Sequence, residues 1–400
     1  MRKPMKDPKL YLCIDNCFAY KRWVKPMDWM LLVKEMGAQY VEQSADTECD
    51  PLYHGAEYMR RWIREIREAS EKTGVQVKNV YSGHGTYCTC GLTHWDPAVR
   101  RRFREQWMKP QADTARALGA GFGFYAHGFE NSLLQDAARY ETRLEGLYDD
   151  LAELARYAGE IGLSYIGLEQ MYTPHMPPWT IDGAEELVRQ VYARCGAAMY
   201  LTVDLGHMNG QQFFPWPREE RILEAISRTR EGKRLKRLWF GTEKAHGFFR
   251  EAVVGKLSPE QAAAQILADA AEHPRLFSRP EDGSIAAWVE RLGCYSPILH
   301  LQQSDGVSSP HWPFSPEYNR RGVVSGEAFM ESLGRAFARE DAPGMPPQVD
   351  EVALTLEPFL GTMANVYDAV EEIAQSVAYW RRFVPRDGMR LSEALALMKV

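Results

Sequence analysis

The sequence predicts an α/β protein that folds as a (β/α)8 TIM barrel with a long insertion between its sixth and seventh strands. Short apolar runs alternate with amphipathic helical segments along the chain, which is typical of parallel strands joined by helical crossovers. Eight such units fit within 400 residues, a length that suits a barrel with additions. No glycine-rich phosphate loop follows the first strand, and its absence argues against an open dinucleotide-binding sheet.

Each unit of the predicted barrel opens with a short apolar, β-branched or aromatic strand. The eight predicted strands cover 10–15, 39–44, 75–85, 121–128, 163–170, 199–207, 296–305 and 349–359. Helical periodicity follows seven of them, over 27–37, 56–74, 100–118, 141–161, 183–196, 325–340 and 364–384. The chain is therefore expected to form one barrel domain over 1–400, with 386–400 as a C-terminal extension.

The sixth unit is much longer than an ordinary strand–helix–strand unit. Its strand ends near residue 204 and the next contains residue 300, whereas about 30 residues suffice for such a unit. Residues 211–280 are therefore predicted to form a helical insertion, which we expect over the carboxyl-terminal mouth of the barrel or at a subunit contact. Its basic run, 228–237, indicates either a solvated helix face or a phosphate-binding lid.

Composition excludes several classes of partner. The chain has 48 basic and 54 acidic residues, so its net charge of −6 argues against a nucleic-acid-binding surface. No run approaches the roughly 18 apolar residues of a membrane span, and the first residues contain no long apolar segment. We expect a soluble, cytoplasmic homo-oligomer, a dimer or a tetramer, that contacts neither nucleic acid nor membranes.

The seven cysteines are dispersed along the chain rather than spaced as a disulfide framework. One group could form a zinc site, and it consists of His84, Cys88, Cys90 and His94. The Cys-x-Cys spacing is tighter than structural zinc sites normally use. A loop with free thiols is therefore the preferred interpretation of this segment.

Polar side chains close four successive strands of the predicted barrel. Glu169 ends the fifth strand, Asp204 and His207 the sixth, His300 the seventh and Glu357 the eighth. The carboxyl-terminal ends of barrel strands surround one mouth, where TIM-barrel enzymes carry their active sites. Any one of these residues could belong to a structural ion pair or to the core. Together they predict a metal site, and their oxygen-rich set suits Mn²⁺, Mg²⁺ or Co²⁺, with zinc also possible.

The sequence around the sixth strand end resembles a known family. Residues 204–209 read DLGHMN, which resembles the D-x-x-H-M-N motif of the sugar isomerase/epimerase superfamily with a xylose-isomerase-like barrel. The branch it most resembles contains D-tagatose and D-psicose 3-epimerases and related sugar-phosphate enzymes. Residues 321–329, RGVVSGEAF, also resemble the stretch that opens helix seven in these proteins. The resemblance covers roughly 10–210 and 285–385, outside the insertion.

The resemblance implies a ligand set, which is Glu169, Asp204, His300 and Glu357 around one divalent ion. It also implies that His207 binds a substrate oxygen. Family epimerases carry an arginine six positions after the strand-seven histidine, but this chain has Gly306 there. Asp305, Arg320 and Arg321 could rebuild that wall of the pocket, so the sugar and its phosphorylation state are left open.

The expected chemistry is proton transfer next to a carbonyl, through a metal-stabilised enediolate, with Glu169 and Glu357 as the acid–base pair. This predicts an isomerase or epimerase of a ketose or sugar phosphate. A lyase, either an inosose-type dehydratase or a deglycosidase, is an alternative on the same site. A non-catalytic sugar-binding protein is a second alternative, although it would be expected to have lost one of the two glutamates. A repair endonuclease is disfavoured, because it would need more metal-binding histidines and a basic groove.

Further residues at the strand ends could bind sugar hydroxyls or pack against the sugar. Glu42, His84 and His127 close the second, third and fourth predicted strands, and each could instead be structural. Trp312, in a predicted loop after the seventh strand, is predicted to contact the sugar, although loop packing is the more common role of such a residue. Three other aromatic residues in such loops are more typical of packing, and these are Phe18, Trp23 and Trp179.

Overall fold

Eight parallel strands close into a barrel in the computed structural model, which describes residues 6–20, 22–44, 48–82, 91–233, 235–361 and 363–399. Each strand pairs with the next in sequence, and β1 pairs with both β2 and β8, which closes the barrel. The strands are β1 Lys9–Asp15, β2 Tyr40–Ser44, β3 Gln76–Tyr81, β4 Gly121–Phe124, β5 Ile166–Glu169, β6 Tyr200–Asp204, β7 Ile298–Leu301 and β8 Glu351–Leu356. The predicted TIM barrel is confirmed.

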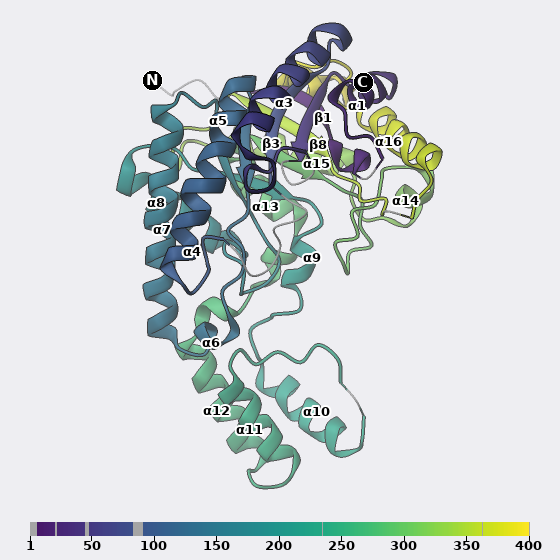
Figure 1. Cartoon of the computed structure of the whole chain (residues 1–400). Helices are drawn as coiled ribbons and strands as arrows, with labels where there is room; N and C mark the ends of the chain where they lie inside the picture. The colour runs from purple at the N-terminus through teal and green to yellow at the C-terminus, as the bar shows by residue number, and fades with distance from the viewer. Residues whose placement is uncertain are drawn as a thin grey trace.

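Helices surround these strands (Figure 1). The main ones are α1 Pro26–Glu35, α3 Pro51–Thr73, α4 Pro97–Phe103, α5 Lys109–Leu118, α7 Ala137–Glu160, α8 Ile181–Cys195, α13 Ile285–Leu292, α15 Gly326–Phe337 and α16 Val366–Trp380. A short π-helical turn, η2 Arg104–Met108, joins α4 to α5, and shorter segments are η1 Asn16–Ala19, α6 Asn131–Leu134, α9 Met208–Gln211, η5 Gly293–Tyr295 and α14 Pro316–Arg321. Among the described residues, no helix has both the length and the apolar sequence that crossing a membrane requires.

Side chains alternate between the two faces of a strand, which explains how a mostly apolar strand places a polar residue at the mouth of the barrel. Successive side chains of a strand point to opposite faces, so Tyr200, Thr202 and Asp204 share one face of β6. Leu201 and Val203, on the other face, are buried in the hydrophobic core. Tyr200 lines a cavity at the amino-terminal ends of the strands, so the same face carries Asp204 at the carboxyl-terminal end.

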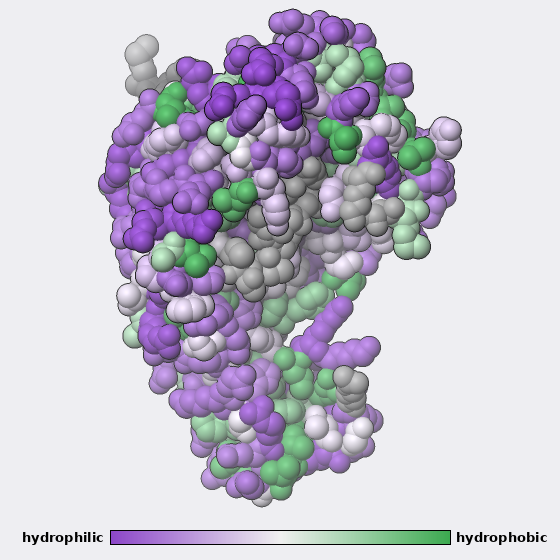
Figure 2. All heavy atoms as spheres, in the orientation of Figure 1, coloured by the Kyte–Doolittle hydropathy of each residue, from purple (hydrophilic) through white to green (hydrophobic). Residues whose placement is uncertain are grey.

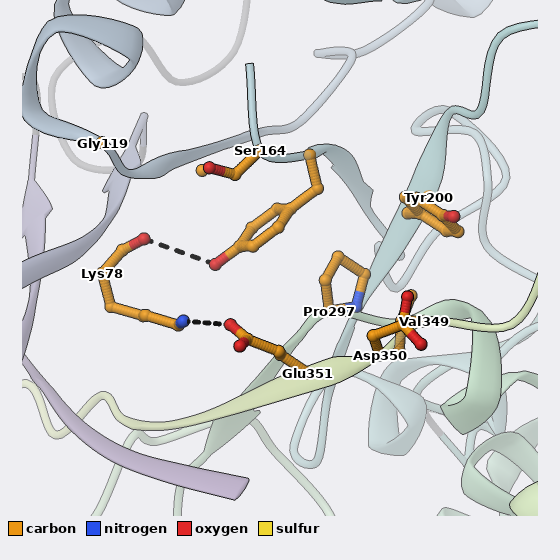
Figure 3. Close-up of a pocket in the computed structure, with 10 residues that line it drawn as sticks. Lys78, Gly119, Ser164, Tyr200, Pro297, Val349, Asp350 and Glu351 are labelled. Carbon is orange, nitrogen blue, oxygen red and sulfur yellow. Dashed lines mark hydrogen bonds and ion pairs between the residues drawn. The ribbon is translucent and has the colours of Figure 1, made fainter. Parts of the chain in front are cut away.

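The cavity at the amino-terminal end has a volume of about 340 Å³. Lys78 and Glu351 point toward each other across it (Figure 3), and Lys78 Nζ lies 2.6 Å from Glu351 Oε2. The Tyr165 hydroxyl donates a hydrogen bond to the carbonyl oxygen of Lys78 at 3.4 Å. This end of a TIM barrel usually serves stability rather than catalysis, and the ion pair that lines the cavity agrees with that role.

Three helices between β6 and β7 form a second hydrophobic core. They are α10 Glu219–Arg230, α11 Glu243–Val253 and α12 Pro259–Glu272, and the short turns η3 Pro274–Leu276 and η4 Pro280–Gly283 lead back to α13. Ile222, Phe249 and Ile266 are among the residues buried in this core. The three helices project away from the barrel (Figure 1), and the surface is notched between the two parts (Figure 2).

The inserted helices lie on the same side of the barrel as the strand ends that carry the polar residues. Arg275 pairs with Glu141 at 2.5 Å and with Glu186 at 3.1 Å. These glutamates lie near the beginnings of α7 and α8, which follow the carboxyl-terminal ends of β4 and β5. The insertion therefore flanks the mouth of the barrel.

The last described residues are attached to the outside of the barrel. Strand β9, Met389–Arg390, pairs antiparallel with the beginning of β1, and α17, Leu391–Leu397, packs against α15. Asp387 accepts a hydrogen bond from the backbone N–H of Leu12 at 2.8 Å and pairs with Arg381 at 2.8 Å. These contacts fix the C-terminal segment to β1.

A buried carboxylate joins α1 to α3. Glu48 Oε2 accepts hydrogen bonds from the indole N–H groups of Trp29, at 3.1 Å, and Trp62, at 3.2 Å. Burial raises the pKa of Glu48 from 4.5 to about 7, although both indole hydrogen bonds oppose that shift. Folding therefore favours the protonated carboxyl group between these pH values.

Glu48→Gln should remove a pH dependence of stability. Because the pKa of Glu48 is higher in the folded state than in the unfolded state, the folded state binds more protons between pH 4.5 and about 7, so the unfolding free energy of the wild type falls as pH rises through this window. We expect the variant to gain about 3 kcal/mol relative to the wild type between pH 4.5 and 7.5, measured by urea denaturation. Glu68→Gln, at an exposed position of α3, is the matched control. A Glu48→Gln protein whose stability changes with pH as the wild type's does would contradict the assignment.

Candidate metal centre

Four side chains meet at the mouth of the barrel. Glu169 is the last residue of β5, Asp204 the last of β6, His300 lies in β7, and Glu357 directly follows β8. Each of the four residues offers one possible ligand atom, and these four atoms all lie within 4.8 Å of one another. All four residues are buried. The structure thus brings together the residues that the sequence places on four successive strands.

The imidazole of His300 is held at both of its nitrogen atoms. Nδ1 faces the centre of the cluster, 3.2 Å from Glu169 Oε1 and 3.1 Å from Glu357 Oε2. On the far side of the ring, Nε2 lies 2.8 Å from Glu42 Oε1. The other oxygen of Glu42 accepts a hydrogen bond from Asn79 Nδ2 at 2.9 Å. This carboxylate–histidine pairing orients the ring and is common behind metal ligands.

The cluster carries an excess of negative charge. Burial alone would lower the pKa of His300, but the carboxylates of Glu357 and Glu42 raise it, and the net pKa lies well above the ordinary value. Burial would raise the pKa of Glu357, but His300 and His311 lower it well below the ordinary value. The carboxylate of Glu357 thus stays ionised and attracts a cation, which is either the proton of an imidazolium or a metal ion.

The DLGHMN segment fixes the carboxylate of Asp204. Asp204 Oδ1 accepts hydrogen bonds from the backbone N–H groups of Gly206, at 2.7 Å, and His207, at 2.9 Å. Gln302 Nε2 approaches both carboxylate oxygens, at 2.8 and 3.0 Å. A Cβ atom at position 206 would lie 2.4 Å from the side-chain amide of Gln302, so glycine is required there for this contact.

The donor set fits a single divalent ion. Glu357 Oε2 is buried and faces the imidazoles of His300 and His311 at 3.1 and 3.4 Å, but it makes no well-aligned hydrogen bond to any described residue, so it can serve as a ligand atom. Three carboxylates and one imidazole form an oxygen-rich set that suits Mn²⁺, Mg²⁺ or Co²⁺. Among the described residues, no cysteine belongs to the cluster.

His207 and Glu42, both predicted to bind substrate, lie beside the cluster. The His207 ring contacts Tyr172, with ring centres 5.0 Å apart, and His207 Nδ1 lies 2.8 Å from the carbonyl oxygen of Gln170. His207 Nε2 lies 4.0 Å from Asp204 Oδ1. Glu42 is completely buried behind His300, so its position favours orienting that histidine over contacting a sugar.

The remaining predicted substrate contacts are not gathered into the cluster. His127 is buried at a positive φ of 67°, and a Cβ atom at Gly91 would lie 2.2 Å from its Nδ1. Trp312 is half-buried, with the guanidinium of Arg321 4.5 Å from its ring centre. His84 lies outside the described residues, together with the two cysteines of the possible zinc site.

The loop after β7 turns tightly at Gly306, which has a φ of 75°. Asp305 caps this turn by accepting hydrogen bonds from the N–H groups of Val307 and Ser308, both at 2.8 Å. Asp305 is used within its own loop, and the Arg321 guanidinium stacks on Trp312, 4.5 Å from the ring centre. That Asp305, Arg320 and Arg321 rebuild this wall of the pocket stays a prediction.

Two residues of this site were missed by sequence reasoning. Gln302 is two positions after His300, so strand alternation could have placed it beside Asp204. His311 could not be found this way, because it lies in a loop at a positive φ of 49°. Its ring stacks on Phe359, with centres 3.9 Å apart, and Nδ1 lies 3.4 Å from Glu357 Oε2.

A second group of possible ligands lies at the end of α12, formed by Asp269, Glu272 and His273. Lys244 Nζ lies 3.1 Å from Asp269 Oδ1, and the Thr242 hydroxyl donates to Asp269 Oδ2. The carboxylate of Asp269 therefore already has a cationic partner. The mouth of the barrel is the better candidate for a metal centre.

Part of the chain matches the model of a known protein family. Residues 30–237, more than half of the chain, match the family model described as xylose isomerase-like TIM barrel. The chain belongs to the xylose isomerase-like TIM barrel family. The resemblance seen in the sequence is thereby confirmed.

Relatives of this xylose isomerase-like barrel cover most of its length. It is 24% identical over 328 residues to D-erythrulose 1-phosphate 3-epimerase of Brucella abortus (strain 2308), which covers 81% of each chain. The fold matches a solved structure from Rhodospirillum rubrum named after xylose isomerase, with a TM-score of 0.65, 20% identity, and coverage of 93% of this chain and 98% of that one. It also matches D-psicose 3-epimerase from Clostridium cellulolyticum H10, solved with D-tagatose, with a TM-score of 0.51, 14% identity and 97% of both chains covered.

Proposed function

We propose that this protein is a divalent-metal-dependent epimerase or isomerase of a ketose or a ketose phosphate. The observation that carries the proposal is the convergence of Glu169, Asp204, His300 and Glu357 at the mouth of the barrel. The activity named for the Brucella relative, 3-epimerisation of D-erythrulose 1-phosphate, supports the substrate class. The D-psicose 3-epimerase likeness supports only the fold.

The four clustered side chains would hold the ion, with His300 binding through Nδ1 because Glu42 occupies Nε2. When bound, a divalent cation polarises a carbonyl and the adjacent hydroxyl as a Lewis acid, which acidifies the C–H bond at the carbon between them. Gln302 and the backbone N–H groups after Asp204 keep that carboxylate in place as a ligand.

Two carboxylates are available to move the proton. Oxygen atoms of Glu169 and Glu357 both lie close to His300 Nδ1, at 3.2 and 3.1 Å. If one takes the proton from the substrate carbon, that carbon becomes planar, and the other can return a proton to its opposite face. Return to the opposite face gives epimerisation, whereas return to the neighbouring carbon gives isomerisation. His207 would bind a substrate oxygen, a role supported by its position 3.7 Å from Glu169 Oε1.

Metal removal tests the proposal. We expect chelator-treated enzyme to lose turnover of ketoses and ketose phosphates, starting with D-erythrulose 1-phosphate, and Mn²⁺, Mg²⁺ or Co²⁺ to restore it. The product should keep the mass of the substrate in ordinary water and gain one deuterium in heavy water. Turnover that is indifferent to chelation would contradict the metal requirement, and a product lighter by one water would instead identify a lyase.

A further inference from the structure

A cavity of about 590 Å³ lies where the insertion leaves the barrel. Four arginines line it, and these are Arg218, Arg221, Arg237 and Arg279. Among the described residues, its lining contains no aspartate or glutamate. Such a concentration of positive charge is unusual in a chain whose net charge is −6.

Two of these arginines have no carboxylate partner in the described part of the chain. Arg218 and Arg237 form no ion pair there, and the guanidinium of Arg237 lies 3.8 Å from the ring centre of Phe213. Arg221 pairs with Glu224 at 3.3 Å, and Arg279 pairs with Asp182 at 2.6 Å, but both pairs are exposed. Exposed pairs contribute little, so all four cations remain available to an anion.

Aromatic side chains give the cavity firm walls. Trp239 donates from its indole N–H to the carbonyl oxygen of Leu276 at 2.8 Å. Trp216 packs against Phe277, with ring centres 5.1 Å apart. These contacts hold the indole ring of Trp239 and one face of Trp216 in the wall of the cavity.

The cavity lies next to the loops at the mouth of the barrel. Gln212, which lines it, donates from Nε2 to the carbonyl oxygens of Asn209, at 2.7 Å, and Gly306, at 2.9 Å. Asn209 belongs to the DLGHMN segment, and its Nδ2 donates to Ser304 Oγ at 2.6 Å. The cavity is thereby connected to the segments that follow Asp204 and His300.

We propose that this cavity binds a phosphate monoester, namely the phosphate group of a phosphorylated ketose substrate. Guanidinium groups match phosphate oxygens in charge and geometry and often bind them with paired hydrogen bonds. The assignment of this phosphate to the substrate, rather than to a separate phosphate compound, rests on the proposed function. The expectation that the cavity binds phosphate does not depend on the proposed function.

Inorganic phosphate tests the cavity directly by isothermal titration calorimetry. We expect the wild type to bind phosphate and Arg218→Ala/Arg237→Ala to bind it at least about tenfold more weakly, since each charge-assisted contact is worth about that factor. Arg218→Lys/Arg237→Lys should retain part of the affinity, because it keeps both charges but not the paired geometry. Arg250→Ala, at an exposed position of α11 outside the cavity, is the control and should bind like the wild type. No binding by the wild type, or equal binding by the alanine variant, would overturn the proposal.

Kinetics then identify the source of the phosphate. If the substrate supplies it, the alanine variant should raise KM for a ketose phosphate at least tenfold and leave KM for the unphosphorylated ketose unchanged. Loss of phosphate binding with an unchanged KM for the ketose phosphate would overturn the assignment to substrate. An enzyme that turns over neither compound would count against the proposed function, and the calorimetric result would still decide whether the cavity binds phosphate.

Discussion

Glu357→Gln is expected to lower kcat by roughly 10²-fold or more while the barrel remains folded, and Glu169→Gln is expected to do the same. Glutamine keeps an oxygen that can face a metal ion but cannot accept the proton. The exchange of substrate C–H with deuterium from solvent should fall in parallel, because the same proton is moved. Both rates are measured at saturating metal, with Glu57→Gln, at an exposed position of α3, as the control.

Two results would change the roles assigned to these glutamates. A Glu357→Gln enzyme with normal turnover and normal exchange would show that Glu357 is structural. A wild-type enzyme that converts its substrate without any solvent exchange would indicate a hydride shift. In that case both glutamates would be ligands, and neither would be the base.

Glu42→Gln is expected to weaken metal binding by about 10- to 100-fold, which is the usual cost of losing a carboxylate behind a ligating histidine. The substitution removes the charge that faces His300 Nε2 at 2.8 Å and conserves the side-chain volume. The readout is the metal Kd, measured by titration of the metal-free protein. At saturating metal, kcat should return close to the wild-type value, because Glu42 positions His300 and does not move the proton.

The same variant also tests whether Glu42 contacts the sugar, as the sequence suggested. An unchanged metal Kd together with a raised KM for substrate would support substrate contact and contradict the positioning role. The complete burial of Glu42 and its hydrogen bond from Asn79 argue for positioning.

The convergence of Glu169, Asp204, His300 and Glu357 could be predicted because it depends on regular structure. Parallel strands of a barrel end at one mouth, and alternation along a strand decides which residues face inward. Asp204 and His300 are also direct neighbours in the register of β6 and β7. The proximity of Asp204 and His300 therefore follows from regular strand pairing, which sequence patterns can predict.

Other features depend on irregular structure, which periodicity does not describe. The pairing of β2 with β3 shifts register between Val41 and Glu42, next to the point where Glu42 meets His300. His311 reaches Glu357 from a loop in a left-handed conformation. The arginine cavity combines segments that are far apart in the chain, from Arg218 to Arg279, so the basic run 228–237 pointed to only part of it.

We expect one divalent ion to bind at the mouth of the barrel. The most direct test is an anomalous difference map from a crystal grown or soaked with Mn²⁺. We expect one strong peak at about 2.0–2.6 Å from oxygen atoms of Glu169, Asp204 and Glu357, with His300 Nδ1 as a further ligand. A map with no peak between these four side chains, or with its only peak at Asp269 and His273, would contradict the claim.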